Sequence, residues 1–133
     1  LLPLRYQDQK ALLYLYRPSE LRKDLKDRLA EALLADAGYP DKGSEQCVAY
    51  LARRFRSGGE FPHEVGLFLS YPPRDVLGFI ENRAVNYKCA GLWKVYGDVE
   101  QAQRLFAKYR KCTDIYCELW RAGSGIGQLA VAV

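Results

Sequence analysis

Leucine recurs every fourth residue over one stretch of the chain, and this repeat constrains the fold more than any other feature. Charged residues fill the opposite face of the same stretch, which is typical of an amphipathic helix with one buried side. Ser19 provides an N-cap and Gly38 a C-terminal stop, so we predict one helix between them. The repeating positions are Leu21, Leu25, Leu29 and Leu33.

Three further segments carry a helical pattern of apolar residues. Ser44 caps the first, which runs to about residue 56. Pro73 suits the first turn of the second. Asp98 caps the third, with Gln101 as its capping-box partner, and apolar residues keep a three-or-four spacing to about residue 121. The chain therefore predicts four helices.

Short apolar runs between these helices predict strands. Residues 1–6 and 11–17 flank a polar link and form an N-terminal β-hairpin. Residues 63–71 are apolar on both faces, as in a central strand buried on both sides. Residues 86–98 form another strand, and residues 129–133 form a final strand or a tail that pairs with a partner. This order predicts an α+β fold with a mixed β-sheet of about four or five strands.

Composition is that of an ordinary globular domain. The length fits a single α+β domain over residues 1–133, and 27% of the residues are charged. No stretch approaches the roughly 20 apolar residues that cross a membrane, so we expect no membrane partner. The net charge is only +4, with both signs interleaved. The chain has no methionine and opens in an apolar run, so we expect a further N-terminal segment upstream.

The four cysteines do not form a recognisable disulfide framework. A domain of this length folds without such bonds, so we interpret the cysteines as reduced thiols of a cytoplasmic protein. Cys112 and Cys117 lie five residues apart on a predicted helix and do not share a face. No cysteine pair has the spacing of a metal site, and we predict none. The other two cysteines of the chain are Cys47 and Cys89.

His63 is the only histidine and the first candidate for chemistry. Pro62 fixes the backbone just before it, and an imidazole can act as a base, an acid or a ligand. On a strand Glu64 would point away from His63, so Glu60 is the better carboxylate to orient the ring. A histidine that bonds only a backbone carbonyl at a strand end is the alternative.

Cys89 and Lys88 indicate a second kind of chemistry. A neighbouring ammonium favours the thiolate form of a cysteine. With His63 as general base, Cys89 would be the nucleophile of a hydrolase or transferase. A core cysteine on a strand explains Cys89 as well.

Lys88, Lys94 and Lys111, with tyrosines nearby, raise nucleic-acid binding as an alternative. Basic residues interleaved with aromatic ones bind single strands, but they are also typical of an exposed helix face. The charge is below that of dedicated nucleic-acid-binding domains. Residues 123–127 are rich in glycine but lack the lysine and the preceding strand of a phosphate-binding loop.

Three motifs, in this order, resemble a bacterial family of unknown function associated mainly with anaerobes. They are EFPHEVGLFLSYPPRDVLGFIEN at 60–82, NYKCAGLWKVYGD at 86–98 and KYRKCTD at 108–114, with Ser70 where the family has glycine. The resemblance implies no particular activity, and any cofactor stays unknown. It does imply an upstream segment with a cysteine near a helix start. The positions it nominates for a site include Glu60, His63, Glu64, Asn86, Lys88, Cys89 and Lys94.

Three functions stay open on these grounds. The best interpretation is a cytoplasmic binding or regulatory module with a polar site around His63, which takes a small anionic ligand or a protein partner. One alternative is a Cys/His-dependent enzyme whose nucleophile is Cys89 or the upstream cysteine. The other is binding of nucleic acid through the basic face of Lys88, Lys94 and Lys111.

Overall fold

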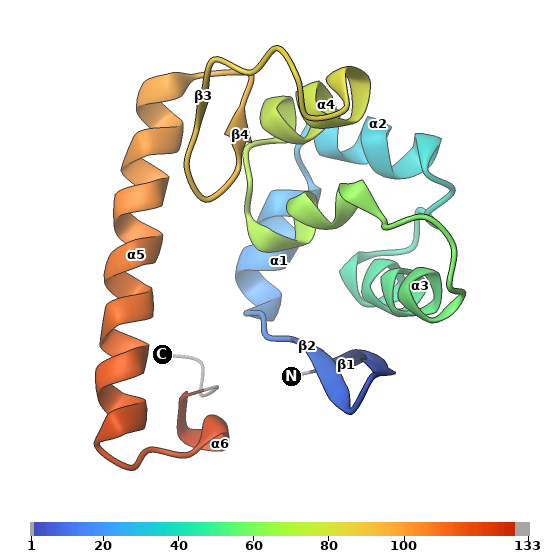
Figure 1. The fold of residues 1–133 in the computed structure, drawn as a ribbon. Coiled ribbons are helices and arrows are strands. Elements are labelled where there is room, and N and C mark those ends of the chain that lie inside the picture. Colours follow the sequence, from blue (N-terminus) through green and yellow to red (C-terminus); the bar gives the residue numbers. More distant parts are fainter. Residues whose placement is uncertain (1, 130–133) are drawn as a thin grey trace.

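Helices dominate the fold, and two small β-hairpins accompany them (Figure 1). The computed structural model describes residues 2–129. In Figure 1, α5 stands beside the rest of the molecule, and the β3–β4 hairpin lies between α5 and α4. The elements are β1 (Leu2–Gln7), β2 (Lys10–Tyr14), α1 (Pro18–Leu25), α2 (Arg28–Asp36), α3 (Ser44–Arg56), the 3₁₀ helix η1 (His63–Leu69), α4 (Pro73–Asn82), β3 (Cys89–Ala90), β4 (Lys94–Val95), α5 (Val99–Arg121) and α6 (Ile126–Leu129).

Two separate antiparallel sheets of two strands each stand where one mixed sheet was predicted. The N-terminal hairpin is confirmed: β1 and β2 pair around Asp8 and Gln9, whose positive φ values of 53° and 61° suit a two-residue turn. The long strand predicted over residues 86–98 is wrong, because β3 and β4 pair through only two residues each. The chain turns at Gly91, where a Cβ would come within 2.5 Å of the Phe106 ring. The α+β class is confirmed, but the two hairpins of the described residues do not join into one sheet.

The leucine repeat forms two helices instead of the one predicted. α1 ends at Leu25, and the Asp27 carboxylate then caps α2 by accepting hydrogen bonds from the amides of Leu29 and Ala30 at 2.9 and 3.1 Å. An aspartate side chain competes with helix continuation in this way. The buried face survives the break, since Leu21, Leu25 and Leu33 all lie in the core.

The predicted caps at Ser19 and Ser44 are wrong by one or two residues. Pro18 is the first residue of α1, and Arg17 precedes it without a side-chain cap. α3 begins at Ser44 itself, and Gly43 takes the N-cap position with a φ of 96°. A glycine adopts this left-handed conformation without strain.

The segment predicted as a central strand is the 3₁₀ helix η1. Glu64, Leu67 and Phe68 are buried, whereas His63 and Leu69 are exposed. Burial at spacings of three and four residues is the pattern of a helical turn. A short run that is apolar on both faces fits a buried helix as well as a buried strand, so periodicity alone did not distinguish them. α4 then begins at the second proline of the Pro-Pro pair, as predicted.

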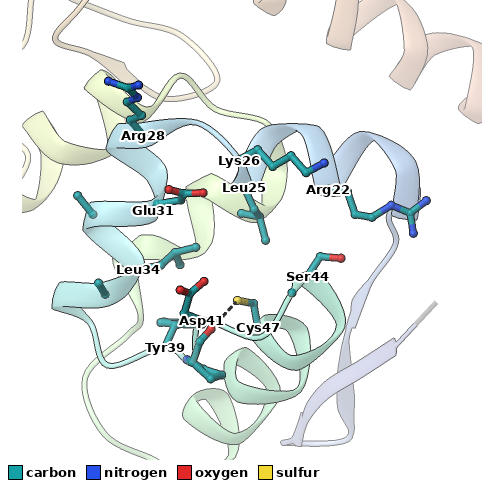
Figure 2. Close-up of a pocket in the computed structure, with 14 residues that line it drawn as sticks. Arg22, Leu25, Lys26, Arg28, Glu31, Leu34, Tyr39, Asp41, Ser44 and Cys47 are labelled. Carbon is teal, nitrogen blue, oxygen red and sulfur yellow. Dashed lines mark hydrogen bonds between the residues drawn. The ribbon is translucent and has the colours of Figure 1, made fainter.

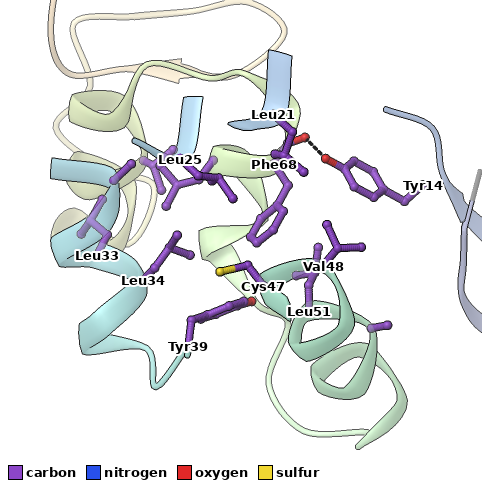
Figure 3. Close-up of a cluster of buried hydrophobic side chains, with 14 of the residues drawn as sticks. Tyr14, Leu21, Leu25, Leu33, Leu34, Tyr39, Cys47, Val48, Leu51 and Phe68 are labelled. Carbon is purple, nitrogen blue, oxygen red and sulfur yellow. Dashed lines mark hydrogen bonds between the residues drawn. The ribbon is translucent and has the colours of Figure 1, made fainter. Parts of the chain in front are cut away.

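The main core lies where α1, α2, α3 and η1 meet (Figure 3). Leu51 of α3 and Leu67 of η1 are among its fully buried side chains. The Tyr14 hydroxyl of β2 donates a hydrogen bond to the Phe68 carbonyl oxygen, which attaches the N-terminal hairpin to η1. Burial raises the pKa of Tyr14, because a phenolate at this place would lose its solvation.

A second cluster joins the β3–β4 hairpin to the first half of α5, and Tyr71 contacts both clusters. α5 begins as predicted, with the Asp98 carboxylate accepting a hydrogen bond from the Gln101 amide at 3.1 Å, and it continues to Arg121. Every side chain from residue 111 to 121 is exposed, so only the first half of α5 packs on the body. The buried members of the cluster are Trp93, Val95, Ala102 and Phe106.

The chain ends, as far as it is described, with the short helix α6. The final strand predicted at residues 129–133 lies outside the described residues except for Leu129, which ends α6. Among the described helices, none has both the length and the apolar character needed to cross a membrane.

Candidate ligand-binding site

A cavity of about 450 Å³ lies between η1, α4 and the β3–β4 hairpin. That volume is within the range of small-molecule sites. The polar exceptions in its mostly apolar wall are two basic side chains, His63 and Lys94, and one carboxylate, Asp75. The large apolar side chains of the wall include Phe61, Leu69, Tyr71, Phe79, Leu92 and Trp93.

Two groups of aromatic rings line this cavity. In the first, Tyr71 and Trp93 stack with their ring centroids 4.2 Å apart and an interplanar angle of 25°. In the second, the His63 ring contacts Phe61 and Phe79, with centroid distances of 5.7 and 5.1 Å. Rings of both groups therefore line one cavity.

His63 is the first residue of η1 and follows the buried Pro62. Its side chain is exposed, and two phenyl rings lie beside the imidazole. The ring borders the cavity on one side and, on the other, an open hollow of about 790 Å³ that Glu60 and Glu64 also line. An imidazole in this position can present a ring nitrogen to a ligand.

Lys94 of β4 is half-buried and held by two contacts. Its Nζ donates a hydrogen bond to the Ala84 carbonyl oxygen at 2.9 Å and lies 4.8 Å from the centroid of the Tyr87 ring. An ammonium has three donors, so the bond to Ala84 leaves others for a ligand. Lys94 is therefore a positioned cation at the border of the cavity.

Asp75 is a buried carboxylate that sequence reasoning missed. One oxygen accepts hydrogen bonds from the amides of Tyr96 and Gly97 at 3.0 and 2.8 Å, and the other accepts one from the indole N–H of Trp93 at 2.8 Å. These bonds attach the β3–β4 hairpin to α4. In the sequence, Asp75 stands out only as an acidic residue in the first turn of a helix. That position does not reveal hydrogen-bond partners 18 to 22 residues away.

Glu64 is buried and serves the core. Its Oε1 lies 2.6 Å from Nε of Arg54 and accepts a hydrogen bond from the Tyr39 hydroxyl at 3.0 Å. Burial first, and the Glu64 charge second, raise the pKa of Tyr39, which keeps this phenol protonated as a donor. The Arg54 side chain is 37% exposed, so Glu64 is the buried member of the pair, and its two contacts account for it structurally.

Three other predicted site residues lie outside the cavity. Glu60 is exposed and lines only the neighbouring hollow. Asn86 is exposed in the connection between α4 and β3, with a positive φ of 63°. Lys88 is exposed, and its Nζ donates a hydrogen bond to the Gly97 carbonyl oxygen at 2.9 Å.

Cys89 packs against the cluster around Trp93 and is half-buried. It is not among the described residues that line the cavity bordered by His63. Lys111 lies on the exposed half of α5, away from the cavity lining. The structure thus brings His63 and Lys94 to one cavity. No group of three or more His, Cys, Asp or Glu side chains within the described residues is arranged to hold a metal ion.

A second cavity, of about 570 Å³, opens between α1, α2 and α3 (Figure 2). Cys47 lies in its wall, where Sγ is 3.5 Å from the Pro40 carbonyl oxygen, and burial raises the pKa of the thiol. Figure 2 shows Arg22 and Arg28 at opposite ends of this cavity, with carboxylates between them. The charged side chains of this second cavity do not meet at one place, and none of the predicted site residues lines it. The second cavity is therefore the weaker candidate for a ligand-binding site.

The fold and the first cavity define a small α+β domain with a mostly apolar cavity. The chain belongs to a family described as proteins of unknown function, DUF3793, whose family model matches residues 1–130. The resemblance to a family of unknown function is thereby confirmed. No curated protein and no solved structure matches the chain.

Proposed function

We propose that this domain binds a small organic anion in the cavity between η1, α4 and the β3–β4 hairpin. One observation carries the proposal: two basic side chains, His63 and Lys94, border a cavity whose wall is otherwise mostly apolar. Apolar walls with a few fixed polar groups are typical of small-molecule sites. The walls contact the body of the ligand, and Lys94 binds its charged group.

The oxygens of Asp75 are occupied by hydrogen bonds within the protein. The side chain is only 2% exposed, and three N–H donors already point at its two oxygens. Lys94, by contrast, has donors to spare, so it is the group that binds the charge of the ligand.

The Cys/His enzyme receives less support from this geometry. Cysteine is missing from the described residues that line the cavity, although His63 is among them. Lys88 and Lys111, two members of the basic face considered for nucleic acid, do not line the cavity with Lys94. We therefore favour binding of a small ligand over catalysis and over nucleic-acid binding.

The thiols support a cytoplasmic location, and the resemblance of the sequence motifs supports a bacterial origin. All four cysteines are free, and Cys112 and Cys117 are exposed. Free exposed thiols persist in reducing compartments, whereas secreted domains usually pair them.

The test is a titration with hexanoate, cyclohexanecarboxylate and benzoate, each paired with its neutral amide and followed by ¹H–¹⁵N NMR. Bound carboxylates should shift the indole N–H of Trp93 and the backbone amide of Leu92, both in the cavity wall, more than the amides do. The indole of Trp120, exposed on α5, is the internal reference. Lys94→Gln should weaken binding about tenfold or more, because a hydrogen bond to a charged group contributes about 1.5–3 kcal/mol.

Lys88→Gln is the matched control. Its Nζ also donates to a backbone carbonyl at 2.9 Å, but Lys88 does not line the cavity, so this variant should bind like wild type. Two results would contradict the proposal. One is that no carboxylate shifts the Trp93 indole at millimolar concentration, and the other is that the Lys88 and Lys94 variants lose binding equally.

A further inference from the structure

We infer that the ligand of this cavity is a planar aromatic carboxylate of one or two rings, held between the two groups of aromatic side chains with its carboxylate on Lys94. This inference rests on the proposed function and narrows it to a chemical class. It depends on three observations: the arrangement of the rings, the size of the cavity and the fixed position of the ammonium.

The rings favour a flat partner over a saturated one. Tyr71 and Trp93 are stacked on one part of the wall, and Phe61, His63 and Phe79 form the other group. Ring contacts in offset-stacked or edge-to-face geometry are favourable beyond the apolar area they bury. A saturated ring of the same size covers the same area without that additional contribution.

The hydrogen bond from Trp93 to Asp75 holds this part of the wall in place. The indole N–H is bound at 2.8 Å, so the Trp93 ring cannot rotate away without breaking a bond to a buried carboxylate. Gly66 contributes in a different way, since a Cβ there would lie 2.9 Å from both Tyr71 and Val76. Its missing side chain allows Tyr71 to sit against η1, so the stacked pair is positioned before any ligand binds.

The size of the cavity limits the ligand to a small one. A volume of about 450 Å³ corresponds to about 15 water molecules at roughly 30 Å³ each. A two-ring carboxylate with about 13 non-hydrogen atoms fits a site of this size, whereas a nucleotide or a peptide would extend well outside it.

The position of Lys94 determines which end of the ligand is charged. Its Nζ is held by the Ala84 carbonyl oxygen and by the face of Tyr87, and Lys94 itself lines the cavity. A carboxylate on this ammonium leaves the rest of the ligand pointing along the aromatic wall. The negative group is therefore a carboxylate at the end of a flat body.

The experiment compares three probes of the same carbon skeleton by calorimetry and ¹H–¹⁵N NMR. They are 2-naphthoate, its fully saturated analogue decahydro-2-naphthoate, and the neutral 2-naphthamide. We expect 2-naphthoate to bind about tenfold more tightly than the saturated acid, and the amide to bind more weakly than 2-naphthoate. Phe79→Leu keeps an apolar wall without its ring, so it should reduce this aromatic preference to about threefold or less.

Two further variants keep the test decisive. Phe61→Leu changes a half-exposed ring of the same group and replaces Phe79→Leu if the latter does not fold. Trp120→Leu removes an exposed ring on α5 that does not line the cavity and should leave the aromatic preference unchanged.

The outcomes separate the two claims. Equal affinities for 2-naphthoate and the saturated acid, with weaker binding of the amide, overturn the aromatic class and leave the anion site standing. Equal affinities for 2-naphthoate and the amide overturn the anion site itself. If none of the three probes shifts the Trp93 indole, both claims are wrong.

Discussion

Asp75 offers the sharpest test of how the cavity is built. Asp75→Asn keeps the shape of the side chain and changes its hydrogen bonding. The amide oxygen can still accept from the Tyr96 and Gly97 amides, but the amide nitrogen then faces the indole N–H of Trp93, which is also a donor. The variant therefore loses one hydrogen bond outright and weakens two others.

The expected cost follows from these three bonds. Leaving the buried Trp93 N–H without an acceptor costs about 1–3 kcal/mol, and two bonds to a charged acceptor become bonds to a neutral one. Relief of the desolvated charge offsets part of this. We expect a net loss of about 2–4 kcal/mol in the free energy of unfolding, a large share of the 5–15 kcal/mol typical of a domain.

Urea unfolding followed by far-ultraviolet circular dichroism measures this loss. Asp98→Asn is the matched control, because Asp98 is an exposed cap and asparagine caps a helix about as well as aspartate. In a Trp93→Phe background, which lacks the indole donor, Asp75→Asn should cost about 1–3 kcal/mol less. The reasoning is refuted if the free energy of unfolding of Asp75→Asn stays within about 0.5 kcal/mol of wild type. It is also refuted if Asp75→Asn costs as much in the Trp93→Phe background as in the wild-type protein.

Burial predicts two further outcomes. The pKa values of Tyr14 and Tyr39 are raised, mainly by burial, so their protonated forms stabilise the fold. This contribution is complete below about pH 10, where an unfolded tyrosine titrates, and is lost above it by about 1.4 kcal/mol per pH unit for each phenol. Urea unfolding between about pH 9 and pH 12 measures the slope, which should be shallower in Tyr14→Phe; an unchanged slope would contradict the assignment. Iodoacetamide at neutral pH should label the exposed Cys112 and Cys117 quickly and Cys47 only on unfolding, since Cys47 is buried and its pKa is raised by burial and by a nearby carboxylate. Mass spectrometry reads the labelled positions, and fast labelling of Cys47 in the folded protein would show that its burial is wrong.

The candidate site was predictable only in part. The motif at residues 60–82 nominated His63 and the motif at 86–98 nominated Lys94, and both residues line one cavity. Phe61, Phe79 and Trp93 were not site candidates from the sequence, because an aromatic residue in an apolar run is usually part of a core. Their role at the cavity depends on which of their faces stays uncovered, and that is a property of the packed molecule.

Glu64 shows why neighbouring residues can be assigned different roles only in three dimensions. It follows His63 directly in the same motif, but it is buried beside Arg54 and Tyr39. The sequence nominated it as a ligand-binding residue. Whether it faces inward depends on whether the segment is a strand or a helical turn, and η1 is a helical turn because of contacts with distant parts of the chain.

The sequence by itself determined the elements whose signals are short-range. The amphipathic repeats, the Asp98 cap and the proline at the start of α4 all act within one or two turns of helix. The two-residue turn of the N-terminal hairpin is equally local. Apart from the break at Asp27 and the caps of α1 and α3, these elements form where the sequence predicts them, because each is specified by residues close together in the chain.

Tertiary structure decided everything that depends on residues far apart. Tyr14 bonds the carbonyl of Phe68 across 54 positions, and Asp75 bonds Trp93 across 18. Such contacts make residues 63–69 a helical turn, dock the β3–β4 hairpin against α4 and α5, and leave the cavity between them. No periodicity or propensity contains this information, because the free energy of each contact exists only once the chain has brought its partners together.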